Sequence, residues 1–397
     1  MQTAHPIGRD APRGEKLNRY ALNGEMVKLT RQRKKRTRRS ASHGLTVVYA
    51  FAMLIPDFES GSDAPLRKYG RKVEMKWICL AVATIACSAF GEWSEYLDAP
   101  PGYAAFPRRV EKLGVYRCDG FDVEEYRQAN GPGTSQRVLL AVPRQGKAPL
   151  PAVAAPFYFP EAMLGFDPKT GGNGTSSGSA ETNLTRYAEI AYMAALARRG
   201  YVTASAEAYH LTYRPDDAPQ DAWKKWRHVG ERLRRDWPGW TGIGKLTFDT
   251  RLLIDLLAAD PRVDTNRIGI IGHSLGGKMA FYAGCLDPRI RVIVASDFGI
   301  GWDQTNWSDP WYWGQTLETV RARGMDHAGL LSLAGGKPFC LIAGKYDDES
   351  SGAMMRRAAG YEGHPERLLL VNHASGHRPP PDATETGYRF LDRFLGP

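Results

Sequence analysis

The stretch Ile268–Lys278, I-G-I-I-G-H-S-L-G-G-K, constrains the fold of this chain more than any other. A run of β-branched residues ends in G-H-S-L-G, and a run compatible with a helix follows at once. This order predicts a strand, a tight turn and a helix, with Ser274 at the turn. Glycine is expected at positions 272 and 276 because a side chain there would collide with the neighbouring elements. We predict that Ser274 is a catalytic nucleophile held above the carboxyl edge of a sheet.

Strand and helix patterns alternate along the chain from about residue 137 onward. This alternation predicts an α/β fold with a mostly parallel central sheet and helices on both faces. Ligands of such sheets bind outside the carboxyl ends of the strands. The Ser274 turn and two Trp-rich insertions, at 210–245 and 299–336, are expected to leave from that edge. The expected strands are 137–142, 151–158, 201–209, 268–271, 291–296, 338–344 and 367–372, and the expected helices are 182–199, 246–259, 278–283, 353–359 and 384–395.

A serine hydroxyl becomes a good nucleophile only when a base accepts its proton, and that base needs an orienting carboxylate. In this architecture the order along the chain is serine, acid and histidine, each in a loop after a strand. Asp347, in the pattern G-x-x-D after the strand 338–344, is the predicted acid. His377, ahead of the last helix, is the predicted base. The second choices are Asp348 and Asp297 for the acid and His373 for the base.

An acyl transfer also needs two backbone N–H groups for the developing oxyanion. Leu275, directly after the nucleophile, is predicted to supply the first. The second is expected from the turn after the strand 151–158, at Phe159 or alternatively at Tyr158.

From about Arg137 to Phe394 the chain resembles the α/β-hydrolase superfamily, and within it the secreted bacterial serine esterases similar to dienelactone hydrolases and acetyl xylan esterases. The matching segments are D-T-N-R-I-G at 264–269, G-H-S-L-G-G at 272–277, G-K-Y-D at 344–347 and G-H at 376–377. Lys278, four residues after the serine, also resembles the glucuronoyl esterases, although that family has Arg where this chain has Leu275. The resemblance implies ester hydrolysis through an acyl-enzyme, without a cofactor and without a metal.

Eight of the ten tryptophans lie in the two insertions. If both insertions overhang the active site, their rings would form an aromatic wall suited to sugar rings or aromatic acyl groups. The alternative is that these rings pack the insertions onto the body of the domain. The predicted substrate-binding residues are Lys278, Trp302, Trp307, Trp311 and Trp313.

The formal charge of +10 belongs to the N-terminal part of the chain. Residues 1–76 carry 17 Lys and Arg against 7 Asp and Glu, and the remaining residues carry 36 of each kind. A neutral body gives no basis for a polyanion-binding face, so no nucleic-acid partner is expected. The three cysteines after residue 90 show no C-x-x-C spacing, so no metal site is expected.

Residues 75–89 have the three parts of a secretory signal peptide, namely a basic start, an apolar core and small residues at the cleavage site. The apolar run is too short for a stable membrane span. We expect cleavage after Ala89 and a secreted or periplasmic protein, with lipoprotein anchoring at Cys87 as a weaker alternative. We expect synthesis to start at Met75, with residues 1–74 an upstream misreading of the gene, and the alternative is that they form a disordered basic tail. Residues 90–397 are expected to be a single domain with an N-terminal extension at 90–136.

The sequence therefore predicts a secreted serine carboxylic ester hydrolase whose substrate is a small-molecule or polysaccharide ester, such as acetylated xylan. A glucuronoyl-type esterase, a serine peptidase of the same fold and a non-catalytic carbohydrate-binding protein are the alternatives.

Overall fold

The computed structural model describes residues 91–172, 190–213 and 222–396. The predicted leader at 1–74 and the predicted signal peptide at 75–89, with Cys87, lie outside the described residues. The described residues all belong to one compact unit. Within these ranges, no helix combines the length and the apolar character that a membrane crossing requires.

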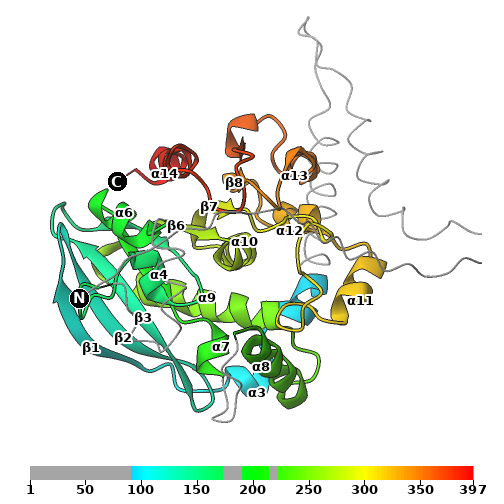
Figure 1. The fold of residues 1–397 in the computed structure, drawn as a ribbon, viewed down its shortest axis with the longest axis horizontal. Coiled ribbons are helices and arrows are strands. Elements are labelled where there is room, and N and C mark those ends of the chain that lie inside the picture. Colours follow the sequence, from blue (N-terminus) through cyan, green and yellow to red (C-terminus); the bar gives the residue numbers. More distant parts are fainter. Residues whose placement is uncertain (1–90, 173–189, 214–221, 397) are drawn as a thin grey trace, which may run out of the picture. The chain divides into compact units, whose positions relative to one another are not determined.

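The described strands form one sheet in the order β1-β2-β3-β5-β4-β6-β7-β8-β9 (Figure 1). From β5 to β9 every neighbouring pair is parallel, which confirms the predicted mostly parallel sheet. From β1 to β5 the pairs are antiparallel. The strands are β1 Val110–Arg117, β2 Phe121–Gly131, β3 Thr134–Pro143, β4 Leu150–Ala154, β5 Val202–Ala206, β6 Val263–His273, β7 Ile290–Ser296, β8 Phe339–Ala343 and β9 Leu368–Asn372.

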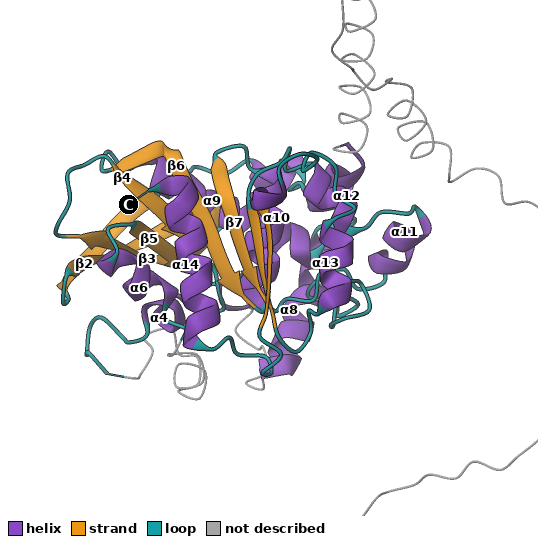
Figure 2. Cartoon of the chain, turned by 90° about the horizontal axis from the view of Figure 1, so that it is seen from above, coloured by secondary structure: helices purple, strands orange, loops and turns teal. Residues whose placement is uncertain are grey.

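Helices cover both faces of the sheet, as the sequence predicts (Figures 1 and 2). Side chains of α4, α6 and α14 share one apolar core with one face, whereas those of α8–α12 share a second core with the other. The helices are α3 Pro101–Ala104, α4 Pro160–Leu164, α6 Tyr192–Arg198, α7 Tyr209–Thr212, α8 Ala222–Asp236, α9 Gly242–Ala259, α10 Leu275–Leu286, α11 Thr316–Ala322, α12 His327–Ser332, α13 Glu349–Met355 and α14 Pro381–Leu395, with a 3₁₀ turn at Pro365–Arg367.

The two cores follow from the alternation of side chains along each strand. On β7, Ile293 points into the core shared with α10, while Val292 and Val294 point into the core shared with α14. All three side chains are fully buried. Strands buried on both faces have continuous apolar sequences, which is why the central strands are visible in the sequence.

Element boundaries differ from the predicted ones where a cap or a turn decides them. The expected strand 201–209 ends at Ala206, and Tyr209 already begins α7. The expected helix 353–359 lies earlier, at Glu349–Met355, because Asp348 caps it and accepts a hydrogen bond from the Ser350 N–H.

The segment 90–136 is more than an extension packed on the domain. Its residues form β1 and β2, which lengthen the sheet by antiparallel pairing with β3. β2 carries buried glutamates, and Glu124 is held by Arg262 at 2.8 and 2.9 Å. Because these polar residues are paired across the sheet, their pattern does not look like that of a buried strand.

A buried ion pair offers a test of this part of the fold. Lys245 and Asp249 on α9 are both buried and hydrogen bonded to each other, and the Lys245 ammonium also donates to the Asn130 carbonyl at 3.2 Å. Asp249→Ala leaves an uncompensated buried cation and should lower the free energy of unfolding by about 3–5 kcal/mol in urea titrations. The double variant Lys245→Met/Asp249→Leu should recover most of this loss. A single variant as stable as the wild type would show that the pair is not buried in this way.

Candidate active site

Ser274 lies on the tight turn that the sequence predicts between β6 and α10. Its backbone has φ 56° and ψ −114°, a positive-φ conformation that a non-glycine residue rarely adopts. The Ser274 N–H donates to the Ser296 carbonyl at 2.8 Å, so the turn is tied to the end of the neighbouring strand β7. Strain of this kind persists only where the surrounding structure enforces it, which is common at active sites.

The two glycines of the motif allow the turn to be this tight. A Cβ atom built at Gly272 would lie 2.0 Å from the Gly276 carbonyl oxygen. A Cβ atom built at Gly276 would lie 2.1 Å from the carbonyl oxygen of Pro156, two residues after β4. Both distances are far shorter than any real contact, so the steric reason predicted for these glycines is confirmed.

The structure brings Ser274 and His377 together across 103 residues of sequence. The Ser274 Oγ lies 2.9 Å from His377 Nε2. The other ring nitrogen, His377 Nδ1, lies 2.5 Å from Asp297 Oδ2. A hydroxyl, an imidazole and a carboxylate therefore form one continuous hydrogen-bonded series, the arrangement that activates a serine nucleophile.

The prediction that Asp347 is the carboxylate beside His377 is wrong, because Asp297, a second choice from the sequence, occupies that place. Asp347 is fully buried, and its two oxygens accept hydrogen bonds from the N–H groups of Gly299 at 2.8 Å and Ile300 at 2.7 Å. Asp347 therefore binds the loop that carries Asp297 instead of orienting the histidine.

Asp297 is held from both sides. While one of its oxygens contacts His377, the other accepts hydrogen bonds from the N–H groups of Tyr346 at 2.7 Å and Asp347 at 3.0 Å. Burial of Asp297 raises its pKa, but the bonds from His377 and these N–H groups outweigh burial, so its pKa is lowered. For Asp347 burial dominates over the Ile300 and Gly299 N–H groups, and its pKa is raised. The carboxyl beside the histidine is thus the one whose pKa its surroundings lower.

Asp348 and His373, the remaining second choices for the acid and the base, lie outside this series. Asp348 caps α13. His373 contacts the Ser375 hydroxyl through Nδ1 at 2.8 Å, two residues along the same loop. His377, the predicted base, is thus the histidine that contacts Ser274, and Asp348 caps a helix.

Leu275, predicted to supply one oxyanion N–H, is the first residue of α10. The free N–H groups and positive dipole end of a helix lie at this terminus, directly beside the Ser274 hydroxyl. Phe159, predicted to supply the other, is the residue before α4, and its side chain is buried. Its alternative, Tyr158, accepts a hydrogen bond from the Ala208 N–H through its carbonyl. The choice between these two residues stays a prediction.

The sequence predicts that Lys278 binds substrate, but its side chain is buried beneath the site. Its ammonium donates to the Phe298 carbonyl at 2.9 Å and lies 4.4 Å from the centre of the Trp307 ring. Burial lowers its pKa to about 7, although the nearby Asp347 and Asp309 raise it. A side chain that is 3% exposed and already bonded has no free face for a substrate.

The predicted substrate contact is wrong for three of the four tryptophans named for it. Trp307, Trp311 and Trp313 are at most 5% exposed and belong to the apolar core on the α10 face of the sheet. They pack the second insertion onto the body of the domain, as the competing interpretation of these rings expects. Trp302 is partly buried, with its indole N–H donating to the Met325 carbonyl at 3.0 Å, so a substrate contact by its ring stays a prediction.

Two neighbours of the base are not predicted from the sequence. The ring of Tyr346 lies edge-on to His377 at 4.9 Å, and the buried ring of His273 lies 4.6 Å from it. His273 directly precedes Ser274, and Tyr346 directly precedes Asp347, so both belong to motifs that the sequence displays. Contacts between such motifs depend on the loop paths, which the sequence pattern does not define.

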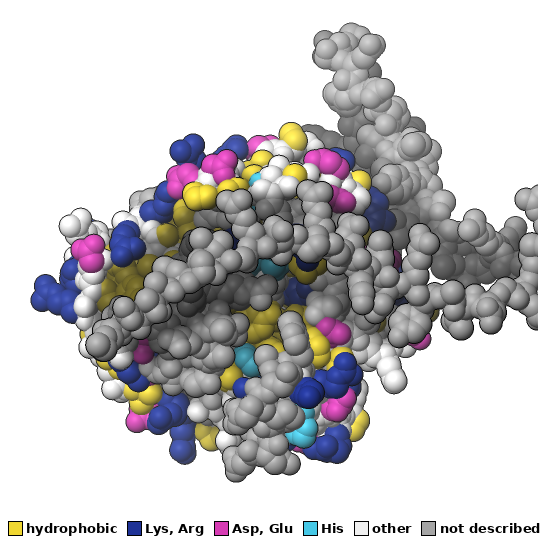
Figure 3. All heavy atoms as spheres, viewed as in Figure 1, with side chains coloured by type: hydrophobic (Ala, Val, Ile, Leu, Met, Phe, Trp, Pro, Cys, Tyr) yellow, Lys and Arg dark blue, Asp and Glu magenta, His cyan; other side chains and the backbone are white. Residues whose placement is uncertain are grey.

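No second site stands out on the rest of the described surface. A groove of about 480 Å³ lies between β1, β2 and α9, and its floor includes Leu140, Leu252 and Leu256, but none of the three site residues lines it. On the face shown in Figure 3, the described Lys and Arg side chains are interspersed with Asp and Glu. Within the ranges that the structure covers, no group of three or more His, Cys, Asp or Glu side chains has the arrangement of a metal site.

Comparison with known families adds to this geometry. The model of the fungal glucuronyl esterase family matches residues 246–314, a segment that contains both Ser274 and Asp297. A comparison with curated protein sequences finds no match.

Several solved structures share the fold. A glucuronoyl esterase from Solibacter usitatus superposes with a TM-score of 0.58 at 16% identity, covering 77% of this chain and 91% of that one. A glucuronoyl esterase from Teredinibacter turnerae T7901 has a TM-score of 0.58 at 17% identity, with 78% and 84% covered. A Bacteroides fragilis protein named as a candidate acetyl xylan esterase has a TM-score of 0.57 at 15% identity, with 86% and 84% covered. The chain therefore has the α/β-hydrolase fold of these esterases, and the predicted resemblance to them is confirmed.

The buried Lys278 predicts a pH dependence of stability. Its pKa is about 7 in the folded protein and about 10.5 for an unburied lysine, so between these values the unfolded chain binds more protons. The free energy of unfolding should then rise with pH across this window. In Lys278→Met this contribution is absent, so the wild type should gain stability relative to the variant between about pH 7 and pH 9 in denaturant titrations. Equal slopes for the two proteins would show that burial does not lower the pKa of this lysine.

Proposed function

We propose that this chain is a serine carboxylic ester hydrolase that acts on carbohydrate esters through an acyl-enzyme. The observation that supports the proposal most is the series from Ser274 Oγ to His377 Nε2, and from His377 Nδ1 to Asp297, at 2.9 and 2.5 Å. These residues lie at the ends of three different parallel strands or in the loops that follow them, where ligands of α/β sheets bind.

Each group has a defined part in the proposed reaction. The Ser274 oxygen attacks the ester carbonyl while its proton passes to His377 Nε2, and Asp297 stabilises the imidazolium that forms. The N–H of Leu275, at the start of α10, would donate to the oxyanion. His377 then returns the proton to the departing alcohol, and an acyl-serine remains. A water molecule, deprotonated by His377, then attacks the acyl carbon; the bond to Ser274 Oγ breaks, the carboxylic acid leaves, and His377 returns the proton to the serine oxygen.

The proposed substrate class is a carbohydrate ester, either an ester of a uronic acid or an acetylated xylan. The support is the match to the glucuronyl esterase model around Ser274 and the shared fold of glucuronoyl esterases and the candidate acetyl xylan esterase. We further propose export of the protein through the signal-peptide pattern at 75–89, as the sequence predicts. N-terminal sequencing of the exported protein tests that part.

A covalent probe tests the proposed nucleophile. A fluorophosphonate reporter should label the wild type at Ser274 and should not label Ser274→Ala, because the hydroxyl is the group that the triad activates. The wild type should also hydrolyse p-nitrophenyl acetate and either methyl glucuronate esters or acetylated xylan. A folded wild type that takes no label and cleaves none of these esters would contradict the proposal and favour a non-catalytic carbohydrate-binding protein. Cleavage of peptides alone would favour a peptidase.

The two buried aspartates give a matched test of the acid. Asp297→Asn should lower kcat on p-nitrophenyl acetate by about 10⁴-fold, since it alters the hydrogen bond that orients the His377 ring. Asp347→Asn keeps one of the two acceptors for the loop N–H groups and contacts neither Ser274 nor His377, so its loss should be smaller. A greater loss in Asp347→Asn than in Asp297→Asn would return the acid role to Asp347.

A further inference from the structure

The acid loop, residues 297–301 after β7, has no regular secondary structure with which to satisfy its own backbone. Asp297 has φ 41° and Gly299 has φ 72°, so the chain turns through left-handed conformations directly after the strand. The loop is nevertheless buried from Asp297 to Gly301. Buried backbone N–H and C=O groups must find partners, and here the partners are side chains from other elements.

Three consecutive carbonyls of the loop each accept a hydrogen bond from a different buried side chain. Phe298 accepts from Lys278 of α10 at 2.9 Å. Gly299 accepts from the Trp307 indole N–H at 2.7 Å. Ile300 pairs with His327 Nδ1, from α12, at 2.5 Å. With the two N–H groups that Asp347 binds, the backbone between Phe298 and Ile300 is held at five points, all by side chains outside the loop.

The hydrogen-bonding direction at His327 follows from the partners of its two ring nitrogens. The Trp313 indole N–H, which can only donate, lies 3.1 Å from the Tyr282 hydroxyl oxygen. The Tyr282 hydroxyl lies 2.7 Å from His327 Nε2. Because the Ile300 carbonyl can only accept, Nδ1 carries the proton and donates to it, and Nε2 of the neutral ring accepts from the Tyr282 O–H. Burial lowers the pKa of His327 to about 3, so the ring stays neutral and this tautomer persists at neutral pH.

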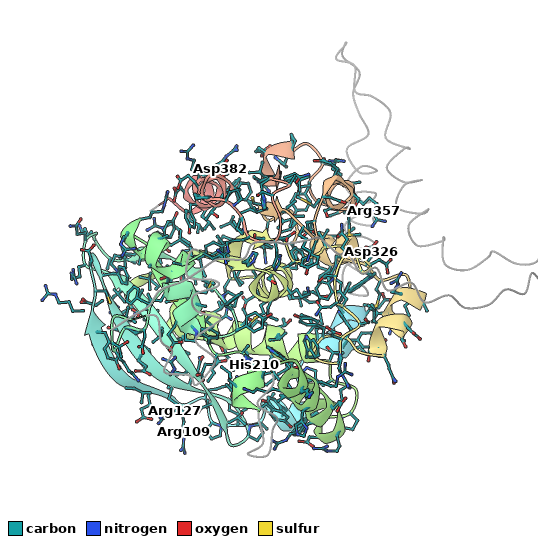
Figure 4. The ribbon with its side chains drawn as sticks, in the orientation of Figure 1. Arg109, Arg127, His210, Asp326, Arg357 and Asp382 are labelled. Carbon is teal, nitrogen blue, oxygen red and sulfur yellow. The ribbon has the colours of Figure 1, made fainter. Side chains whose placement is uncertain are left out.

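His327 is itself fixed by the start of its helix. The preceding residue, Asp326, caps α12 by accepting a hydrogen bond from the Gly329 N–H at 2.9 Å. The same carboxylate pairs with Arg357 at 2.6 Å, beyond the end of α13, and Figure 4 labels both side chains. Ring contacts from Trp302 at 3.9 Å and Trp307 at 4.7 Å restrict the imidazole. The Ile300 carbonyl is thus bound by an imidazole whose own position is fixed by a helix cap and by ring contacts.

We propose that His327 and Trp307 are positioning residues for Asp297: by binding consecutive carbonyls of the acid loop, they hold the Asp297 carboxylate in line with His377 Nδ1. This inference rests on the proposed function, since it assigns a purpose to the precise placement of the acid. Both side chains bond to the backbone of the loop, so their effect on Asp297 passes through that backbone. Small displacements of a catalytic group can cost about 10²-fold in rate.

Two substitutions at residue 327 separate positioning from packing. In His327→Asn the amide nitrogen occupies the place of Nδ1 and can still donate to Ile300, whereas in His327→Gln it occupies the place of Nε2. The glutamine is closer to histidine in volume, so a purely packing role would favour it. Positioning predicts the opposite: His327→Gln should lose roughly 10²-fold in kcat with KM unchanged, while His327→Asn keeps most of the activity. Equal losses, or a better glutamine variant, would overturn the proposal.

A second pair covers the case in which substitution at His327 prevents folding. Trp307→Phe removes the donor to Gly299, and Trp240→Phe is the matched control, because that buried indole donates to the Leu97 carbonyl at 3.4 Å, away from the acid loop. Trp307→Phe should lower kcat well below that of Trp240→Phe at a similar loss of melting temperature. Equal kcat values in the two variants would overturn the proposal.

Proton NMR distinguishes failure of this inference from failure of the proposed function. The hydrogen-bonded Nδ1 proton of His377 should give a downfield signal in the wild type that is retained in His327→Asn and lost or shifted in His327→Gln. This readout does not require turnover. If the wild type cleaves no ester, the proposed function fails, and the signal still reports whether His327 holds Asp297. An unchanged signal in His327→Gln would overturn the positioning role.

Discussion

The structure of the site depends on a reciprocal hold between two loops at the carboxyl edge of the sheet. Asp297, after β7, accepts N–H groups from the loop after β8, and Asp347, in that second loop, accepts N–H groups from the loop after β7. The two strands are parallel neighbours, with Ser296 paired to Ile342, so their ends meet at one edge. Each carboxylate therefore orders the backbone that carries the other. These mutual hydrogen bonds place Asp297 where it contacts His377.

The electrostatics of the two carboxylates differ although the residues are close. Asp297 has a lowered pKa because a histidine and several N–H groups favour its charged form, whereas burial dominates at Asp347 and raises its pKa. Environments that shift the pKa values of two neighbouring carboxyl groups in opposite directions commonly give the two groups different roles. Here one carboxylate faces the histidine, and the other is enclosed as part of the scaffold.

Much of this arrangement can be predicted from the sequence, and the exceptions have physical reasons. Ser274 and His377 are predictable because the strand, turn and glycine pattern is local and the order of site residues follows the topology. Which aspartate contacts His377 is harder to predict, since Asp297 and Asp347 both follow apolar strands at the same edge. What decides between them is the direction of each side chain, and at Asp297 this depends on a left-handed backbone that no sequence pattern indicates.

Burial of polar and aromatic residues explains the remaining differences. Strand β2 is missed because Glu124 and Glu125 look exposed in sequence, while ion pairs with Arg262 and Arg137 allow them to be buried. The sequence around residue 307 is equally rich in tryptophan whether these rings line a cleft or pack into a core. Only the three-dimensional contacts show that the Trp307 indole N–H donates a hydrogen bond to a carbonyl of the acid loop.

Detection of the acyl-enzyme tests the central claim most directly. The wild type would be mixed with p-nitrophenyl acetate, quenched within the first turnover and analysed by peptide mass spectrometry. The account predicts a burst of p-nitrophenol together with an acetyl group on Ser274. Ester cleavage without a covalent intermediate, or with the acetyl group on another residue, would contradict it.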